Sequence, residues 1–220
     1  MSVNRIGAEL VSGVERIGAF MSARAGRRTR AGWAVPLALA TLLCAVASAQ
    51  AAVNPGDPVG EVAAPDEGGQ RRSVQDLRGK VVVLVFWGSE CPSSKRYAQR
   101  LAVLSRKWGD KVAFLGVASN GYEDAGKVKA AKQAQGLPFP VLIDAGGKIA
   151  HRLGVGTTPI ALVVDAQGVV RYRGQIDDDP RGDKGDQAQA WLRDAVQAVL
   201  DGRAPPQAKS PTEQGSLIKS

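Results

Sequence analysis

The sequence predicts an α/β fold in which helices flank a central mixed β-sheet. An apolar, largely β-branched run begins at Val81 and ends at Gly88, which is the length of a buried strand rather than of a helix. A segment with helical periodicity opens immediately afterwards at Pro92. Strand-like and helix-like segments then alternate, and a final hairpin is followed by one more helix. This order is typical of an α/β sandwich.

The other elements follow from their turn signals and apolar spacing. A lead-in rich in Pro, Gly and Asp over residues 55–66 predicts a short hairpin at the edge of the sheet. Residues 77–80 turn the chain into the central strand. After the first helix we expect a strand at 112–118, a loop at 119–122, a helix at 124–135, a strand at 141–144, a short helix at 149–153, strands at 160–164 and 169–173, and a helix at 186–200.

The first 51 residues indicate a targeting segment. Residues 21–51 combine several arginines, an apolar run and small residues in Ala-x-Ala order, as in a secretory signal peptide. Residues 1–20 are then an extension that arises from the choice of start site. We expect a periplasmic or secreted protein that begins between Gln50 and Val53, which N-terminal sequencing of the exported chain would test. The alternative is an uncleaved N-terminal membrane anchor facing the periplasm, although the run is short for a span.

The remaining chain has the length of one domain, predicted over residues 55–202. Residues 203–220 are rich in Pro, Lys, Gln and Ser and predict a flexible tail. Six of the 29 basic and two of the 21 acidic residues lie in residues 1–51, which leaves a net charge of about +4 for the rest. The basic residues are scattered and not interleaved with aromatics, so no nucleic-acid partner is expected. Membrane contact is expected only if the N-terminal segment stays in place.

Cys91 is the candidate nucleophile. It lies between the buried strand and Pro92, and proline suits the first position of a helix because the N–H that it lacks would be unpaired there. The dipole and the free N–H groups at a helix N-terminus favour the thiolate over the thiol. Lys95 and Arg96 add positive charge one turn further on. The alternative is that Cys91 is merely a small buried apolar residue.

The residues around Cys91 carry a family resemblance. The segment FWGSECPSS over residues 86–94 resembles the Phe-Trp-Ala-x-Trp-Cys-x-x-Cys signature of thioredoxin-like redoxins. More narrowly, CPSSKRY over residues 91–97 looks like the Cys-Pro-x-x-x-x-Tyr variant of exported bacterial redoxin (AhpC/TSA-type) proteins with a single active-site cysteine. The segment GTTPIALVVD over residues 156–165 is similar to the Thr-Pro loop and following strand of that family. The resemblance spans about residues 55–202 and implies a thioredoxin-like fold with a cis-proline loop facing the cysteine.

The resemblance also implies a set of site residues. Ser94 stands where many redoxins have the second, resolving cysteine, and a hydroxyl cannot resolve a mixed disulfide. The ending GSLIK over residues 215–219 is loosely similar to a Gly-Cys-x-Ile-Lys tail of some redoxins, with Ser216 in place of the cysteine. The implied catalytic positions are Cys91, Ser94, Thr158 and Pro159, and the implied substrate groove is formed by Trp87, Glu90, Pro92 and Lys95.

Cysteine content limits the chemistry. If the targeting segment is removed, Cys44 leaves with it and Cys91 is the single cysteine of the mature protein. We therefore expect an enzyme that carries out monothiol thiol–disulfide exchange with protein or low-molecular-weight thiols and disulfides, and an external thiol that resolves the adduct. Glu90 stands where the family has tryptophan, and a carboxylate beside the cysteine opposes thiolate formation.

Two alternatives stay open. A one-Cys peroxiredoxin-like thiol peroxidase would act on peroxide, but Gly88 and Leu84 occupy the places of its loop Thr/Ser and Pro. No arginine lies between Arg152 and Arg171, where such an enzyme carries one. A non-catalytic thioredoxin-like module would use the same groove only to bind an extended peptide.

No cofactor and no metal is expected. His151 is the only histidine and lies in a polar stretch beside Arg152, which argues against a Cys–His pair and supplies too few ligands for zinc or iron. The aspartates over residues 177–186 could surround a calcium ion, but acidic loops of this kind are usually only solvated.

Overall fold

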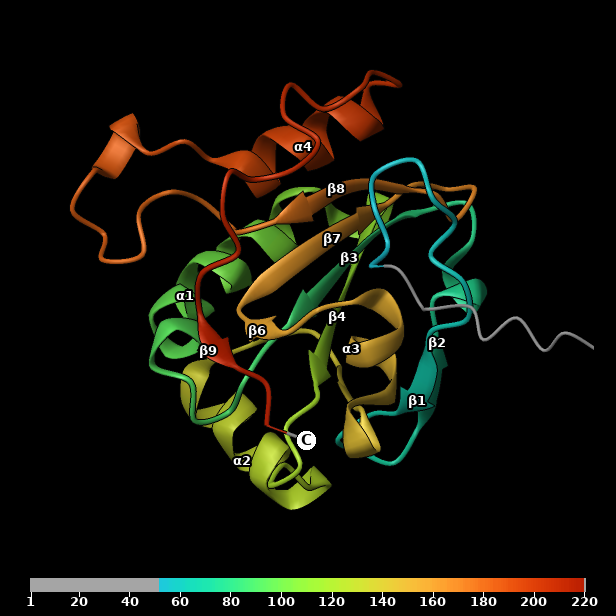
Figure 1. Ribbon diagram of the computed structural model, residues 1–220, viewed down its shortest axis with the longest axis vertical. Helices are drawn as coiled ribbons and strands as arrows, with labels where there is room; N and C mark the ends of the chain where they lie inside the picture. The colour runs from blue at the N-terminus through green and yellow to red at the C-terminus, as the bar shows by residue number, and fades with distance from the viewer. Residues whose placement is uncertain (1–51, 220) are drawn as a thin grey trace, which may run out of the picture. The chain divides into compact units, whose positions relative to one another are not determined.

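The computed structural model describes residues 52–219 (Figure 1). Five strands form a mixed sheet in the order β5-β4-β3-β7-β8, with β3 parallel to β4 and antiparallel to β7. Helices cover the sheet on both faces, which confirms the predicted α/β, thioredoxin-like class. The strands are β3 (Val81–Phe86), β4 (Val112–Ala118), β5 (Val141–Ile143), β7 (Ile160–Val164) and β8 (Val170–Gly174).

The central strand β3 is buried on both faces. Because neighbouring side chains of a strand point to opposite faces, Val83 and Val85 enter one apolar layer while Val82 and Leu84 enter the other. The first layer contains side chains of α1, α2 and α4, and the second contains α3 and the lead-in. This double burial explains why the run shows no polar alternation. The helices are α1 (Pro92–Lys107), α2 (Ala125–Gln135), α3 (Lys148–Leu153) and α4 (Trp191–Leu200).

The helix boundaries follow the capping signals except at α4. Asp124 caps α2 by accepting from the Lys127 N–H, and Gly136 ends it in the left-handed conformation. The last helix begins at Trp191 instead of residue 186, because Ala188 is extended (φ −64°, ψ 135°) and separates the 3-10 turn at Gly185–Gln187 from the helix. Short 3-10 turns lie at Gln75–Leu77, Gly109–Lys111, Ala145–Gly147 and Gly185–Gln187.

The lead-in hairpin extends further than its sequence indicates. Its strands are β1 (Ala63–Pro65) and β2 (Arg71–Ser73), which form a separate antiparallel pair. One bridge between Asp66 and Leu142 links this pair to β5, the edge of the main sheet. The predicted bounds of the hairpin, 55–66, were wrong because its second strand lies beyond them, where Arg-Arg-Ser carries none of the apolar or β-branched side chains that mark a strand.

The C-terminal tail departs from the predicted flexible segment. In the structure it returns along the domain, and β9 (Ser216–Leu217) pairs antiparallel with β6 (Thr157–Thr158), as Figure 1 shows in red beside orange. Glu213 forms an ion pair with the buried Arg173, and Ser210 is buried as well. Composition alone missed these contacts because they are made by backbone groups and single polar side chains, without an apolar pattern.

Several predictions fall outside the described residues. The start-site extension 1–20, the signal peptide 21–51 with Cys44, and the alternative membrane anchor all lie there, so export remains a prediction. Within residues 52–219, no helix has both the length and the apolar character that crossing a bilayer requires.

Candidate active site

Cys91 lies where β3 gives way to α1, at the N-cap of the helix. The turn before it depends on Gly88, whose N–H donates to Ser94 Oγ at 3.1 Å. A Cβ at Gly88 would lie 2.9 Å from Cys91 Cβ and 3.1 Å from Thr158 Oγ1, closer than ordinary contact. A residue without a side chain is therefore needed to bring the cysteine against the loop that carries Thr158.

The Thr158–Pro159 loop faces Cys91. Its peptide bond is cis, the isomer that the family resemblance implies. The Cys91 thiol lies 3.3 Å from the carbonyl oxygen of Thr158, to which the protonated sulfur donates. Both Thr158 and Pro159 are buried, because β6 and β7 continue on either side of the loop. The structure therefore brings Cys91 and the Thr158–Pro159 loop together, as expected.

Three groups stabilise the Cys91 thiolate. The sulfur lies 3.4 Å from the backbone N–H of Ser94 and 3.0 Å from Ser216 Oγ, whose hydroxyl can donate to a thiolate. Burial raises the pKa of Cys91, but hydrogen bonds with the side chains of Ser216, Ser94 and Thr158 and with the Ser94 N–H outweigh burial and lower the pKa to about 7. A substantial fraction of Cys91 is therefore thiolate at neutral pH, even though only 4% of the residue is exposed.

Ser216 reaches the sulfur because the last residues of the chain cover the site. In the β6–β9 register, Ser216 is the partner of Thr158. The backbone N–H of Lys219 donates to Asn120 Oδ1 at 3.0 Å, and the Gly121 N–H donates to the Lys219 carbonyl at 2.6 Å. We call residues 214–219 the covering segment.

A buried carboxylate organises the loop that receives the covering segment. Glu123 accepts hydrogen bonds from the backbone N–H of Ser89 at 2.5 Å and from the backbone and side-chain nitrogens of Asn120, both at 3.0 Å. It thereby joins the loop after β4 to the turn before Cys91. Asn120, Tyr122 and Glu123 were not predicted from the sequence. A signal was available, because these polar residues follow the buried strand β4, which pairs with the strand that leads to Cys91.

The predicted groove residues separate into two groups. Glu90 and Pro92 are exposed and line a cavity of about 210 Å³ beside Cys91, together with Asn120 and Tyr122. Glu90 is not among the largest influences on the pKa of Cys91, which is lowered in spite of the opposition expected from this carboxylate.

Trp87 and Lys95 do not line this cavity. Trp87 is fully buried, since strand alternation sends its indole into the layer beneath α1 and α2, where Nε1 donates to Gln135 Oε1 at 3.1 Å. Lys95 is exposed on α1 and does not line the cavity. The groove assignment of Trp87 was therefore wrong, whereas that of Lys95 stays a prediction.

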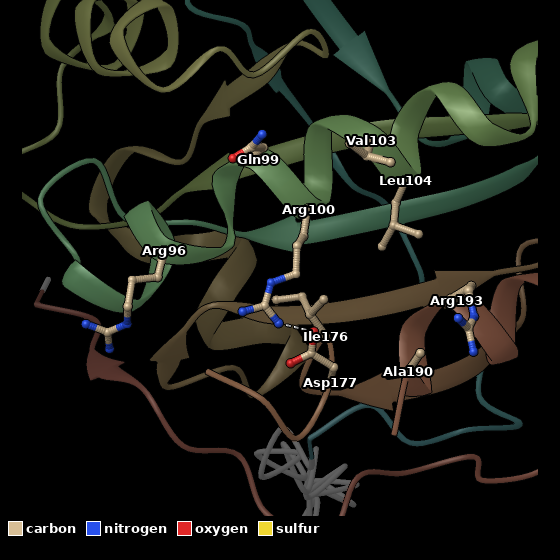
Figure 2. Close-up of a pocket in the computed structure, with 9 residues that line it drawn as sticks. All are labelled: Arg96, Gln99, Arg100, Val103, Leu104, Ile176, Asp177, Ala190 and Arg193. Carbon is tan, nitrogen blue, oxygen red and sulfur yellow. Dashed lines mark hydrogen bonds and ion pairs between the residues drawn. The ribbon is translucent and has the colours of Figure 1, made fainter. Parts of the chain in front are cut away.

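A larger cavity of about 440 Å³ lies between α1 and the start of α4 (Figure 2). Arg96, Arg100 and Arg193 line it, and Arg100 is paired with Asp177. It holds no cysteine or histidine, so this larger cavity has no nucleophile for the chemistry of Cys91.

The acidic loop uses its carboxylates within the protein. Asp177 accepts from Tyr97 Oη at 2.7 Å and pairs with Arg100, and Asp178 pairs with Lys184. Asp179 accepts backbone N–H groups of the same loop, including that of Gly182 at 2.8 Å. Over residues 52–219, no group of acidic, histidine or cysteine side chains is arranged as a metal site. The only histidine, His151, is exposed on α3.

The site can therefore supply one activated thiolate, and within the described residues it offers no second thiol. The hydroxyls of Ser94 and Ser216 can donate hydrogen bonds to the sulfur but cannot form a disulfide with it.

Comparisons with known proteins agree with this geometry. The model of the AhpC/TSA family matches residues 55–173. The thioredoxin-like protein YneN of Bacillus subtilis (strain 168) is 32% identical over 104 residues, which cover 47% of this chain and 61% of that protein. The thiol-disulfide oxidoreductase ResA of Bacillus thuringiensis (strain Al Hakam) is 34% identical over 102 residues, 46% of this chain and 58% of that protein. The chain thus spans about three fifths of the length of these relatives.

A solved structure extends the likeness to most of the chain. The hypothetical protein SMc02350 of Sinorhizobium meliloti 1021 superposes with a TM-score of 0.70 at 28% sequence identity. The match covers 77% of this chain and 96% of that protein.

Proposed function

The chain belongs to the AhpC/TSA family, and from this premise we propose that it carries out monothiol thiol–disulfide exchange through Cys91. The substrate is a protein or low-molecular-weight disulfide, and an external thiol resolves the adduct. One observation carries the proposal: the Cys91 sulfur lies at a helix N-terminus opposite Thr158, with its pKa lowered to about 7. A pKa near the working pH favours a thiol that must attack and later leave.

The exchange has two steps. The Cys91 thiolate attacks one sulfur of the substrate disulfide, the S–S bond of the substrate breaks, and its other sulfur leaves with the electron pair as a thiolate. An external thiolate then attacks the mixed disulfide and releases Cys91 as a thiolate. Ser94 and Ser216 stabilise the sulfur but cannot take the second step, so the adduct persists until the external thiol arrives.

Relatives support this reaction class without supplying its details. Two relatives are named as a thioredoxin-like protein and a thiol-disulfide oxidoreductase, and the chain spans about three fifths of each. The single-thiol cycle rests instead on residues of this chain, because Cys91 is the only free cysteine within the described residues and serines occupy both neighbouring positions.

The peroxidase alternative has weaker support. Efficient reaction with peroxide needs donors that polarise the O–O bond, and the hydrogen-bond partners of Cys91 over residues 52–219 include no guanidinium. The peptide-binding alternative shares the same loop and differs only in the reactivity of the thiol.

The test uses glutathione disulfide as the probe. We expect one glutathione per chain, mapped to Cys91 by peptide mass spectrometry, removed by reductant and absent in Cys91→Ser. Rapid consumption of peroxide without any disulfide adduct would favour the peroxidase. A Cys91 thiol that reacts with neither probe would leave only the peptide-binding module.

A further inference from the structure

The covering segment occupies the place that a partner peptide needs at this site. Ser216 pairs with Thr158 in the antiparallel β6–β9 register, and its Oγ lies 3.0 Å from Cys91 Sγ. Any extended peptide that brings a sulfur to Cys91 along β6 must use the same backbone groups. The chain's own end and a substrate peptide therefore compete for one position.

The fit of the covering segment also shows which residues this position accepts. Gly215 lies against the backbone of Thr158, and a Cβ there would overlap the Thr158 carbonyl oxygen, far inside van der Waals contact. Ser216 faces the sulfur, whereas Leu217 is 72% exposed. Ile218 packs against the apolar layer beneath the sheet.

From these contacts we propose that the covering segment is an internal mimic of the substrate, and that the partner it excludes is an extended peptide with a cysteine directly after a glycine and an apolar residue two positions further on. This inference rests on the proposed function, because it defines the partner of the same exchange reaction. Ser216 marks the position of the sulfur that Cys91 attacks. The covering segment must leave before that attack and takes Ser216 with it, so the thiolate is then stabilised by the backbone N–H of Ser94 at the start of α1.

The segment is held firmly enough to cover the site but weakly enough to exchange. Its backbone bonds include Ile218 N–H to the Gly156 carbonyl at 2.9 Å and the two bonds between Lys219 and the loop at Asn120 and Gly121. An incoming strand can make equivalent backbone hydrogen bonds, so displacement of the covering segment exchanges one set of bonds for another. Cys91 is accordingly almost inaccessible until the exchange occurs.

The first test locates the segment without relying on activity. In the full chain, Ser216→Cys should form a disulfide between Cys91 and the introduced thiol under mild oxidation. Leu217→Cys is the matched control, because its exposed side chain points away from the sulfur, and it should cross-link at least tenfold less. Equal cross-linking of the two variants would overturn the assignment of the covering segment.

The second test opens the site. Gly215→Ala should displace the segment and raise the rate at which iodoacetamide alkylates Cys91 by at least about tenfold, a change equal to the loss of one or two backbone hydrogen bonds. Val103→Ala is the control, because this side chain is 61% exposed on α1, outside both the covering segment and the cavity beside Cys91, and the variant should react like the wild type. If Gly215→Ala leaves the rate unchanged, the inference that the segment restricts access is wrong.

The third test concerns the partner. In the Gly215→Ala variant, the peptide Gln-Gly-Cys-Leu-Ile-Lys, activated as its mixed disulfide with glutathione, should form an adduct at least tenfold faster than the same peptide with alanine before the cysteine. Equal rates, with normal reaction of glutathione disulfide, would overturn this inference and leave the proposed exchange intact. No reaction of Cys91 with any disulfide would overturn the exchange itself.

Discussion

The two halves of the C-terminal segment lie on the same domain but are held by different forces. Residues 203–213, the anchoring segment, end in Glu213, which pairs with Arg173, a side chain only 3% exposed. The covering segment, residues 214–219, is held mainly by backbone hydrogen bonds and the contact of Ser216 with Cys91. A buried charge requires its partner, whereas a backbone bond can be exchanged for another. The difference separates a structural anchor from a removable cover.

The anchoring segment should carry most of the stability. Arg173 bonds both carboxylate oxygens of Glu213, at 2.5 and 3.0 Å, and donates to the Leu153 and Gly154 carbonyls. Glu213→Ala should lower the free energy of unfolding by about 2–4 kcal/mol, since Arg173 loses the one counter-charge it has among residues 52–219 but keeps its carbonyl acceptors. Urea unfolding followed by circular dichroism measures this change.

The covering segment supplies the control for that measurement. Leu217→Ser, at an exposed position, should change the free energy of unfolding by no more than about 0.5 kcal/mol. If both variants lose similar stability, the distinction between anchor and cover is wrong.

The hydroxyl of Ser216 gives the covering segment a smaller, electrostatic effect. Its hydrogen bond is the largest influence that lowers the pKa of Cys91, although burial opposes it. Ser216→Ala should therefore move the pKa upward from about 7 toward the ordinary value of 9.0. Between these two values, the variant holds less thiolate than the wild type at every pH. The ultraviolet absorbance of the thiolate, titrated against pH, measures the midpoint directly, and Cys91→Ser supplies the baseline.

Glu90→Gln gives a comparison on the other side of the cysteine. Glu90 is exposed and is not among the largest influences on the pKa of Cys91, so this variant should leave the midpoint in place. A midpoint that falls in Glu90→Gln, or one that stays fixed in Ser216→Ala, would contradict the assignment of thiolate stabilisation to the serine.

Much of the fold was predictable because its signals are local. The buried run before Gly88, the proline after Cys91 and the glycine after α2 each reflect a backbone or burial requirement that one segment expresses alone. The start of α4 was misplaced because the extended conformation of Ala188, which interrupts the chain before the helix, leaves no trace in the apolar spacing.

The candidate site was predictable only in part, because some of its contacts join segments that are distant in sequence. Cys91 and the Thr158–Pro159 loop were identifiable from motifs, and they meet as expected. The approach of Ser216 to Cys91 depends on the pairing of β9 with β6. A strand of only two residues carries no compositional signal that would predict this pairing. Trp87 was assigned to the groove although strand alternation places it in the core.

The central claim is that Cys91 works through a single thiol and waits for an external one. The most direct measurement is the lifetime of the glutathione adduct on Cys91 after excess glutathione disulfide is removed, followed by mass spectrometry in the wild type and in Ser94→Cys. The account predicts that the wild-type adduct persists until a thiol is added. In Ser94→Cys, an internal thiol at high effective concentration should shorten the lifetime at least about a hundredfold. A wild-type adduct that disappears without added thiol, as fast as that of Ser94→Cys, would contradict the account.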